Sequence, residues 1–303
     1  MRVHVLGSGA GGGLPQWNCA CENCALARAN DPRVARRTQD SIAVAGKDER
    51  VLLVNASPDV LRHIEAFPGL WPRSPRHTPI AAIALTNGDL DHVVGLLSLR
   101  ESQPLRILAT PQVRAGLVER NAVLRTLART REQVQWVDFV LGRETVLEDL
   151  ELGVTPLPAP GKLPVHLVGV VEPSPEDNVA LRVRDLSTGR VLAIATAIGG
   201  FEGVEPLVVG AGAVLFDGTF WSDDELIALG LGRARARDMA HVPVGGPEGS
   251  LARFAASPAL AGARRVYTHI NNTNPMLRAD SAQRAEVERA GWAIAFDGME
   301  LSL

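Results

Sequence analysis

A strand followed at once by a cluster of titratable side chains is the feature that most constrains this chain. Residues 80–85 form an almost continuous apolar run, which is typical of a strand buried on both faces. The loop after this run holds Asp89, Asp91 and His92, and residues 93–99 have the pattern of a helix start. Because α/β proteins hold ligands in such strand-to-helix loops, we predict a metal-binding loop here. The alternative is that an aspartate only caps the helix.

The rest of the chain alternates between strand and helix patterns, which predicts an α/β fold. Residues 41–44 and 50–54 have the pattern of a hairpin, and residues 165–171, 179–183 and 191–195 are predicted strands separated by turn residues. The glycines between positions 7 and 13 do not fit a dinucleotide-binding motif, so we expect them to let the backbone pass close beneath the metal loop.

Two later strands end in possible metal ligands. Asp217 follows the apolar residues 213–216, and His269 follows the predicted strand at 265–268. His241 precedes a predicted helix at 250–256, where it either lines the active site or serves only as a cap. We expect His241 to have a role in the pocket.

The three cysteines of the chain, Cys19, Cys21 and Cys24, lie within six residues of one another. An odd number at this spacing does not suit a disulfide framework, whereas three thiolates on one turn can occupy three corners of a tetrahedral zinc site. The cluster therefore predicts a structural zinc. The alternative is three buried free thiols.

The composition excludes several classes of function. The chain has 303 residues, 46% of them hydrophobic, which is enough to form a full core. A net charge of −3 argues against a nucleic-acid surface, so we expect small molecules or short peptides as partners, and oligomerisation is possible. No apolar stretch is long enough to span a membrane and no signal peptide is evident, so a cytoplasmic location is expected.

The metal loop resembles the H-x-H-x-D-H signature of the metallo-β-lactamase superfamily. Asp91 and His92 match the last two signature positions, whereas Asn87 and Asp89 replace its first two histidines. This substitution pattern also resembles a family within the superfamily that acts in pyrroloquinoline quinone (PQQ) biosynthesis. The resemblance covers nearly the whole chain and implies a four-layer αββα sandwich, with residues 1–303 as a single domain and a zinc loop at residues 19–24.

The resemblance also implies the ligands of two metal sites. Asp91, His92, Asp217 and His269 match the second active-site metal of the superfamily, and the first metal site is damaged. Lys162 is nearest in chain order to the missing third histidine, and it could hold an anionic substrate. Relatives with a similar cysteine motif take a fourth zinc ligand from a histidine where this chain has Asn272.

The function implied by the resemblance is addition of oxygen to the aromatic ring of a cross-linked glutamate–tyrosine precursor of PQQ. A one-metal site with two imidazoles and open positions suits Fe(II) as well as other divalent metals. We therefore expect an iron-dependent hydroxylase in which Asp89, Lys162 and His241 are catalytic. A zinc hydrolase and a non-catalytic carrier of PQQ or a precursor are the alternatives.

Overall fold

The computed structural model describes residues 1–303 except 102, 122, 124, 127–132 and 256. Two seven-stranded sheets form its centre. The first contains β1 (Arg2–Gly7), β2 (Ser41–Ala45), β3 (Val51–Val54), β4 (Ile80–Ala84), β5 (Leu105–Ala109), β6 (Val134–Asp138) and β14 (Met299–Ser302). The second contains β7 (Thr145–Leu147), β8 (Leu152–Pro158), β9 (Val179–Asp185), β10 (Val191–Ala195), β11 (Ala213–Asp217), β12 (Arg264–Thr268) and β13 (Trp292–Ile294).

The strand order is β14-β1-β2-β3-β4-β5-β6 in the first sheet and β13-β12-β11-β10-β9-β8-β7 in the second. The strands from β3 to β6 are parallel, as are those from β10 to β13, and the remaining neighbours pair antiparallel. The hairpin predicted for residues 41–54 is confirmed as β2 and β3.

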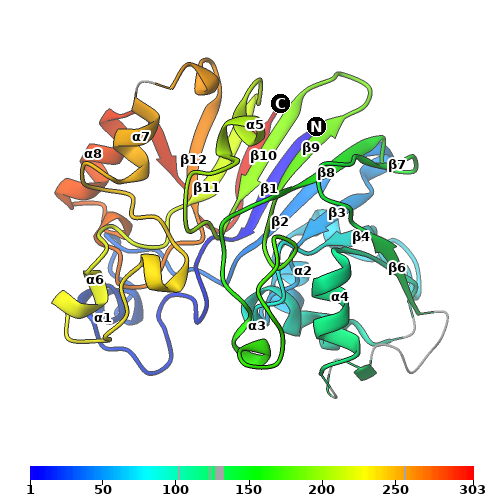
Figure 1. The fold of residues 1–303 in the computed structure, drawn as a ribbon, viewed down its shortest axis with the longest axis horizontal. Coiled ribbons are helices and arrows are strands. Elements are labelled where there is room, and N and C mark those ends of the chain that lie inside the picture. Colours follow the sequence, from blue (N-terminus) through cyan, green and yellow to red (C-terminus); the bar gives the residue numbers. More distant parts are fainter. Residues whose placement is uncertain (102, 122, 124, 127–132, 256) are drawn as a thin grey trace.

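Eight helices accompany the sheets in the described part of the chain. They are α1 (Glu22–Arg28), α2 (Val60–Ala66), α3 (Leu90–Val93), α4 (Pro111–Val118), α5 (Val204–Val208), α6 (Glu225–Ala228), α7 (Ser250–Ala255) and α8 (Ala282–Arg289). In Figure 1, α2 and α4 lie on one side of the sheets, and α7 and α8 lie on the other.

The apolar core has three layers, which confirms the four-layer αββα sandwich. The central layer joins facing side chains of the two sheets, such as Val54 and Leu215. One outer layer packs α2 and α4 against the first sheet through residues such as Leu117, and the other packs α7 and α8 against the second through residues such as Phe254. Apolar burial on both faces explains why the parallel strands are almost wholly apolar.

The predicted strand at residues 165–171 is wrong. This segment contains a single 3₁₀ turn, Val165–Leu167, and the side chains of Val165, Val168 and Val170 are all more than half exposed. Gly169 has a φ of 75°, a left-handed conformation that interrupts an extended strand. The predicted helix start at residues 93–99 is realised as the last residue of α3 and a 3₁₀ helix at Val94–Leu99.

The glycine-rich loop after β1 is attached to the C-terminal part of the chain by Asp297. One carboxylate oxygen of Asp297 accepts hydrogen bonds from the backbone and hydroxyl of Ser8, at 3.0 and 2.8 Å. The other oxygen accepts from the backbone and hydroxyl of Thr38, at 2.6 and 2.7 Å. Gly11 of this loop lies against the metal loop, because a Cβ there would lie 3.1 Å from Asp91 Oδ2. The prediction is therefore confirmed for Gly11, whereas Gly7, Gly9 and Gly13 pass close to residues 37–39 instead.

We predict that Asp297→Ala lowers the free energy of unfolding by about 1–3 kcal/mol, because it leaves several donors without an acceptor. Urea denaturation measures this loss. Glu300→Ala is the matched control, since the Glu300 side chain is 69% exposed and should contribute less than about 0.5 kcal/mol. Equal transition midpoints for Asp297→Ala and the unsubstituted protein would contradict this role.

Candidate metal centre and cysteine cluster

Three predicted ligands, Asp91, His92 and His269, converge at one point between the two sheets. Asp91 and His92 lie in α3 directly after β4, and His269 follows β12 in the second sheet. The two Nε2 atoms are 3.3 Å apart, and Asp91 Oδ2 lies 3.9 Å from His92 Nε2 and 3.5 Å from His269 Nε2. Both imidazoles are buried.

These separations fit a divalent metal. Two ligand atoms bound at about 2.1 Å and at roughly 90–109° to each other lie about 3.0–3.4 Å apart. The observed distances are close to these values, so small movements of the three side chains would complete three corners of a coordination shell. Two imidazoles and one carboxylate form the donor set used by non-haem iron(II) oxygenases, and zinc also accepts such ligands.

Two threonines hold the histidine rings from behind. Thr86 Oγ1 lies 2.9 Å from His92 Nδ1, and Thr219 Oγ1 lies 2.9 Å from His269 Nδ1. Thr86 donates its own hydroxyl proton to Asn55 Oδ1, at 3.0 Å, and Thr219 donates to Asp217 Oδ1, at 2.6 Å. Because each threonine hydroxyl donates its proton elsewhere, its oxygen can only accept a hydrogen bond from the histidine, so Nδ1 carries the proton. The Nε2 lone pairs of both histidines are then directed at the shared point.

Asp217 and His241 form a second buried pair next to His269. Asp217 Oδ2 is 2.6 Å from His241 Nδ1 and also accepts from the backbone of Ile198. The other oxygen accepts from the backbone and hydroxyl of Thr219. The ligand atoms of Asp217, His241 and His269 lie within 4.8 Å of one another, so this trio could also hold a metal. With its oxygens already engaged, Asp217 is well placed to orient the neighbouring rings.

The electrostatic environment gives the two central histidines, His92 and His269, very different pKa values. Burial lowers the pKa of His92 to about 4. Burial also opposes protonation of His269, but its hydrogen bond to Asp91 and the charges of Asp40 and Asp91 outweigh burial and raise its pKa to about 9. Burial opposes ionisation of Asp91, but the two imidazoles hold the pKa of this carboxyl well below its usual range. Negative charge thus gathers around His269, where a cation is favoured.

The cysteine cluster forms a second candidate metal site. The Sγ atoms of Cys19, Cys21 and Cys24 lie within 4.8 Å of one another. Asn272 Nδ2 lies 3.2, 3.5 and 3.3 Å from them respectively, so the amide points at the centre of the three sulfurs. Rotation of this amide by 180° would present Oδ1 instead, as an oxygen ligand at the same place.

Comparisons with known proteins show the family of the chain. Residues 50–270 match the model of a family described as beta-lactamase superfamily domain. The chain is 45% identical over 311 residues to coenzyme PQQ synthesis protein B of Methylobacterium nodulans and 39% identical over 308 residues to that of Xanthomonas oryzae pv. oryzae. Each alignment covers 100% of both proteins. The chain belongs to the coenzyme PQQ synthesis protein B (PqqB) family.

Solved structures show the same fold. The crystal structure of Zn²⁺-bound PqqB from Methylobacterium extorquens has a TM-score of 0.91 and 42% identity, with 100% of each chain covered. A diphosphatase of the PhnP family has a TM-score of 0.68 at 19% identity, with 99% of this chain and 97% of that chain covered, and it shows only that the fold is shared.

Other residues predicted from the sequence lie around the loop that carries Asp91 and His92. Asn87 is turned away: its Nδ2 donates to Asn178 Oδ1 at 3.1 Å, and its Oδ1 accepts from the backbone of Asp89. Burial raises the pKa of the Asp89 carboxyl to about 6, and the charges of Asp91 and Lys162 shift it in opposite directions. Asp89 therefore lies close enough to Lys162 for their charges to interact.

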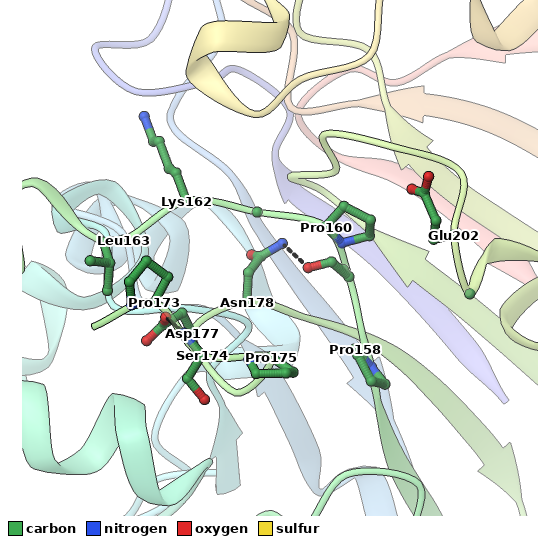
Figure 2. Close-up of a pocket in the computed structure, with 13 residues that line it drawn as sticks. Pro158, Pro160, Lys162, Leu163, Pro173, Ser174, Pro175, Asp177, Asn178 and Glu202 are labelled. Carbon is green, nitrogen blue, oxygen red and sulfur yellow. Dashed lines mark hydrogen bonds between the residues drawn. The ribbon is translucent and has the colours of Figure 1, made fainter. Parts of the chain in front are cut away.

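Lys162 is exposed and lies at the edge of a cavity of about 420 Å³. Figure 2 shows its side chain extending away from the other residues around the cavity, which include Pro160, Pro173 and Asp177. Asn178, which binds Asn87, also lines this cavity, so the cavity and the metal loop share a wall.

Sequence reasoning missed the threonines behind the histidines. Thr86 and Thr219 are each within a few residues of a predicted ligand, but threonine has no distinctive role at such a position. A threonine next to a strand end becomes informative only when its distance to an imidazole nitrogen is known.

We predict that Cys21→Ser lowers the zinc content of the purified protein by one zinc per chain and reduces its soluble yield, because structural zinc contributes directly to folding. Elemental analysis measures the zinc. Ala20→Ser, in the same loop but outside the cluster, should keep the full zinc content and yield. Unchanged zinc in Cys21→Ser would show that the cysteines hold no metal.

Proposed function

We propose that this chain acts in PQQ biosynthesis as an Fe(II)- and O₂-dependent hydroxylase of the tyrosine ring in a cross-linked glutamate–tyrosine precursor. The place in PQQ biosynthesis rests on the names of relatives that match over their full length. The single observation that carries the reaction type is the convergence of Asp91, His92 and His269, because two histidines and one carboxylate are the ligand set of non-haem iron(II) oxygenases.

The missing first-metal site supports a one-metal centre. Asn87 is occupied by hydrogen bonds to Asn178 and to the backbone of Asp89, so its side chain is not directed at the three converging ligands. The superfamily signature that this loop resembles has histidines where the chain has Asn87 and Asp89, so two imidazole ligands of a first metal are absent. A single metal would supply the coordination positions at which O₂ and a phenol can meet.

His241 is the proposed proton-transfer residue. Its Nδ1 is held by Asp217 at 2.6 Å, so Nε2 is the nitrogen that can accept or donate a proton during the reaction. The His241 ring stacks on that of His269 with 5.5 Å between centroids, which places it beside the metal ligands. We propose that Lys162, exposed near Asp89, holds a carboxylate of the substrate.

The reaction has a defined balance of atoms and electrons. Insertion of one atom of O₂ into an aromatic C–H bond sends the other atom to water and consumes two electrons and two protons. A two-electron reductant such as ascorbate must therefore be present in the assay. A zinc hydrolase is the second candidate, because a relative was solved with Zn²⁺ bound, and hydrolysis needs neither O₂ nor reductant.

We predict that anaerobically Fe(II)-loaded protein, given the cross-linked precursor, ascorbate and ¹⁸O₂, incorporates ¹⁸O into the tyrosine ring. Mass spectrometry of the product measures the label. Label that comes only from water, or equal turnover without O₂, would reject the oxygenase and favour the hydrolase. Tight binding of PQQ or the precursor without turnover would favour a carrier.

Two histidine variants should separate metal binding from proton transfer. We predict that His269→Ala loses both iron and activity, whereas His241→Ala keeps its iron and turns over about 10²–10⁴-fold more slowly. Iron content and the rate constant kcat are measured on the same preparations. His77→Ala, in the loop before β4, is the control and should retain both. Loss of iron from His241→Ala would instead make His241 a ligand.

A further inference from the structure

A buried carboxylate outside the ligand set, Asp40, lies where the ends of the two sheets meet. Asp40 directly precedes β2 in the first sheet, and only 1% of its surface is exposed. Asp40 Oδ2 accepts a hydrogen bond from Asn55 Nδ2 at 3.3 Å, and Asp40 Oδ1 accepts from Thr268 Oγ1 at 3.5 Å. Its two oxygens therefore contact different sheets.

The contact with Asn55 connects Asp40 to His92 through a chain of hydrogen bonds, in which each residue donates to the next. His92 Nδ1–H donates to Thr86 Oγ1, Thr86 donates to Asn55 Oδ1, and Asn55 Nδ2 donates to Asp40. Asn55 is fully buried and has a φ of 60°, a costly conformation that the surrounding contacts maintain. Asn55 Oδ1 also accepts from the backbone N–H of Thr86, at 3.0 Å, so this N–H and Asp40 hold the Asn55 amide in one orientation from its two ends.

The contact with Thr268 leads to His269. Thr268 is the last residue of β12, and His269 follows it with a φ of 54°, also in the left-handed region. This backbone turn brings the His269 ring toward His92. The hydrogen bond from Thr268 to Asp40 ties the start of that turn to the first sheet.

We propose that Asp40 is the positioning residue shared by both histidine ligands of the metal site. Asp40 helps to orient the Asn55 amide, which accepts the Thr86 hydroxyl and so supports the Nδ1–H tautomer of His92. Through Thr268 it holds the strand end that presents His269. This inference rests on the proposed metal site but not on the identity of the reaction. Partners behind a ligating histidine typically change metal affinity by about 10–100-fold when they are removed.

Titration with Co(II), which has a visible spectrum sensitive to ligand geometry, tests the proposal without a turnover assay. We predict that Asp40→Ala binds Co(II) about 10–100-fold more weakly than the unsubstituted protein and shows shifted d–d bands. Asp40→Asn offers one acceptor oxygen in place of two, so one contact should be lost and the affinity should be intermediate. Thr86→Val and Thr268→Val each remove one of the two arms and should each weaken binding.

Ser250→Ala is the matched control, because the buried Ser250 hydroxyl bonds Tyr267 Oη and no residue of the chain that leads to the histidines among the described contacts. It should leave affinity and spectrum unchanged. Circular dichroism monitors folding in each variant. Unchanged Co(II) affinity and spectrum in Asp40→Ala, or in Asp40→Asn if the alanine variant does not fold, would overturn the proposal.

The Co(II)-binding test of Asp40 can succeed or fail independently of the hydroxylation assay. Co(II) binding that His269→Ala abolishes and Asp40→Ala weakens would support the positioning role even in a protein that hydroxylates nothing. Absence of Co(II) binding to the unsubstituted protein at this site would overturn the positioning role together with the proposed metal centre.

Discussion

The approach of His92 to His269, with 3.3 Å between their Nε2 atoms, is the contact on which the candidate site depends. Two buried imidazoles that direct lone pairs at each other repel unless a proton or a metal lies between them. Asp91 adds a carboxylate beside the pair, so a cation is favoured. The fold supports the pair by bringing β4 and β12, from two different sheets, to a common edge.

The supporting hydrogen bonds are arranged in parallel on the two sheets. On the first sheet Thr86 lies behind His92, and on the second Thr219 lies behind His269. Behind these threonines are an amide, Asn55, and a carboxylate, Asp217. The cysteine cluster adds a further constraint on the second sheet, since Asn272 lies three residues after His269 and Asn23 of α1 binds the backbone oxygens of Asn272 and Asn274. The cluster and Asn23 therefore attach the segment after His269 to the N-terminal part of the chain.

Much of the fold and part of the site could be predicted from the sequence. Titratable residues in the loops that follow apolar strands predict ligands, as Asp91, His92 and His269 show, because α/β proteins hold ligands beyond the carboxyl ends of their strands. That these loops, from two different sheets, meet at one point could be inferred only from the family resemblance. Asn55, Thr86 and Asp40 could not be predicted, since their partners depend on sheet register and on which strands become neighbours. The strand prediction for residues 165–171 was wrong for a related reason. An apolar run forms a strand only where a neighbouring strand can pair with it through hydrogen bonds. Membership of the PqqB family and the sandwich fold agree with the family resemblance in the metal loop.

A crystal structure of the protein loaded anaerobically with Fe(II), with iron located by anomalous scattering, would show whether the two histidines and Asp91 hold a single metal. We predict one iron at the active site, about 2.0–2.2 Å from Asp91 Oδ2, His92 Nε2 and His269 Nε2, with Asn87 still bonded to Asn178. Two metals bridged between this point and the side chains of Asn87 and Asp89, or no metal between the histidines, would contradict it.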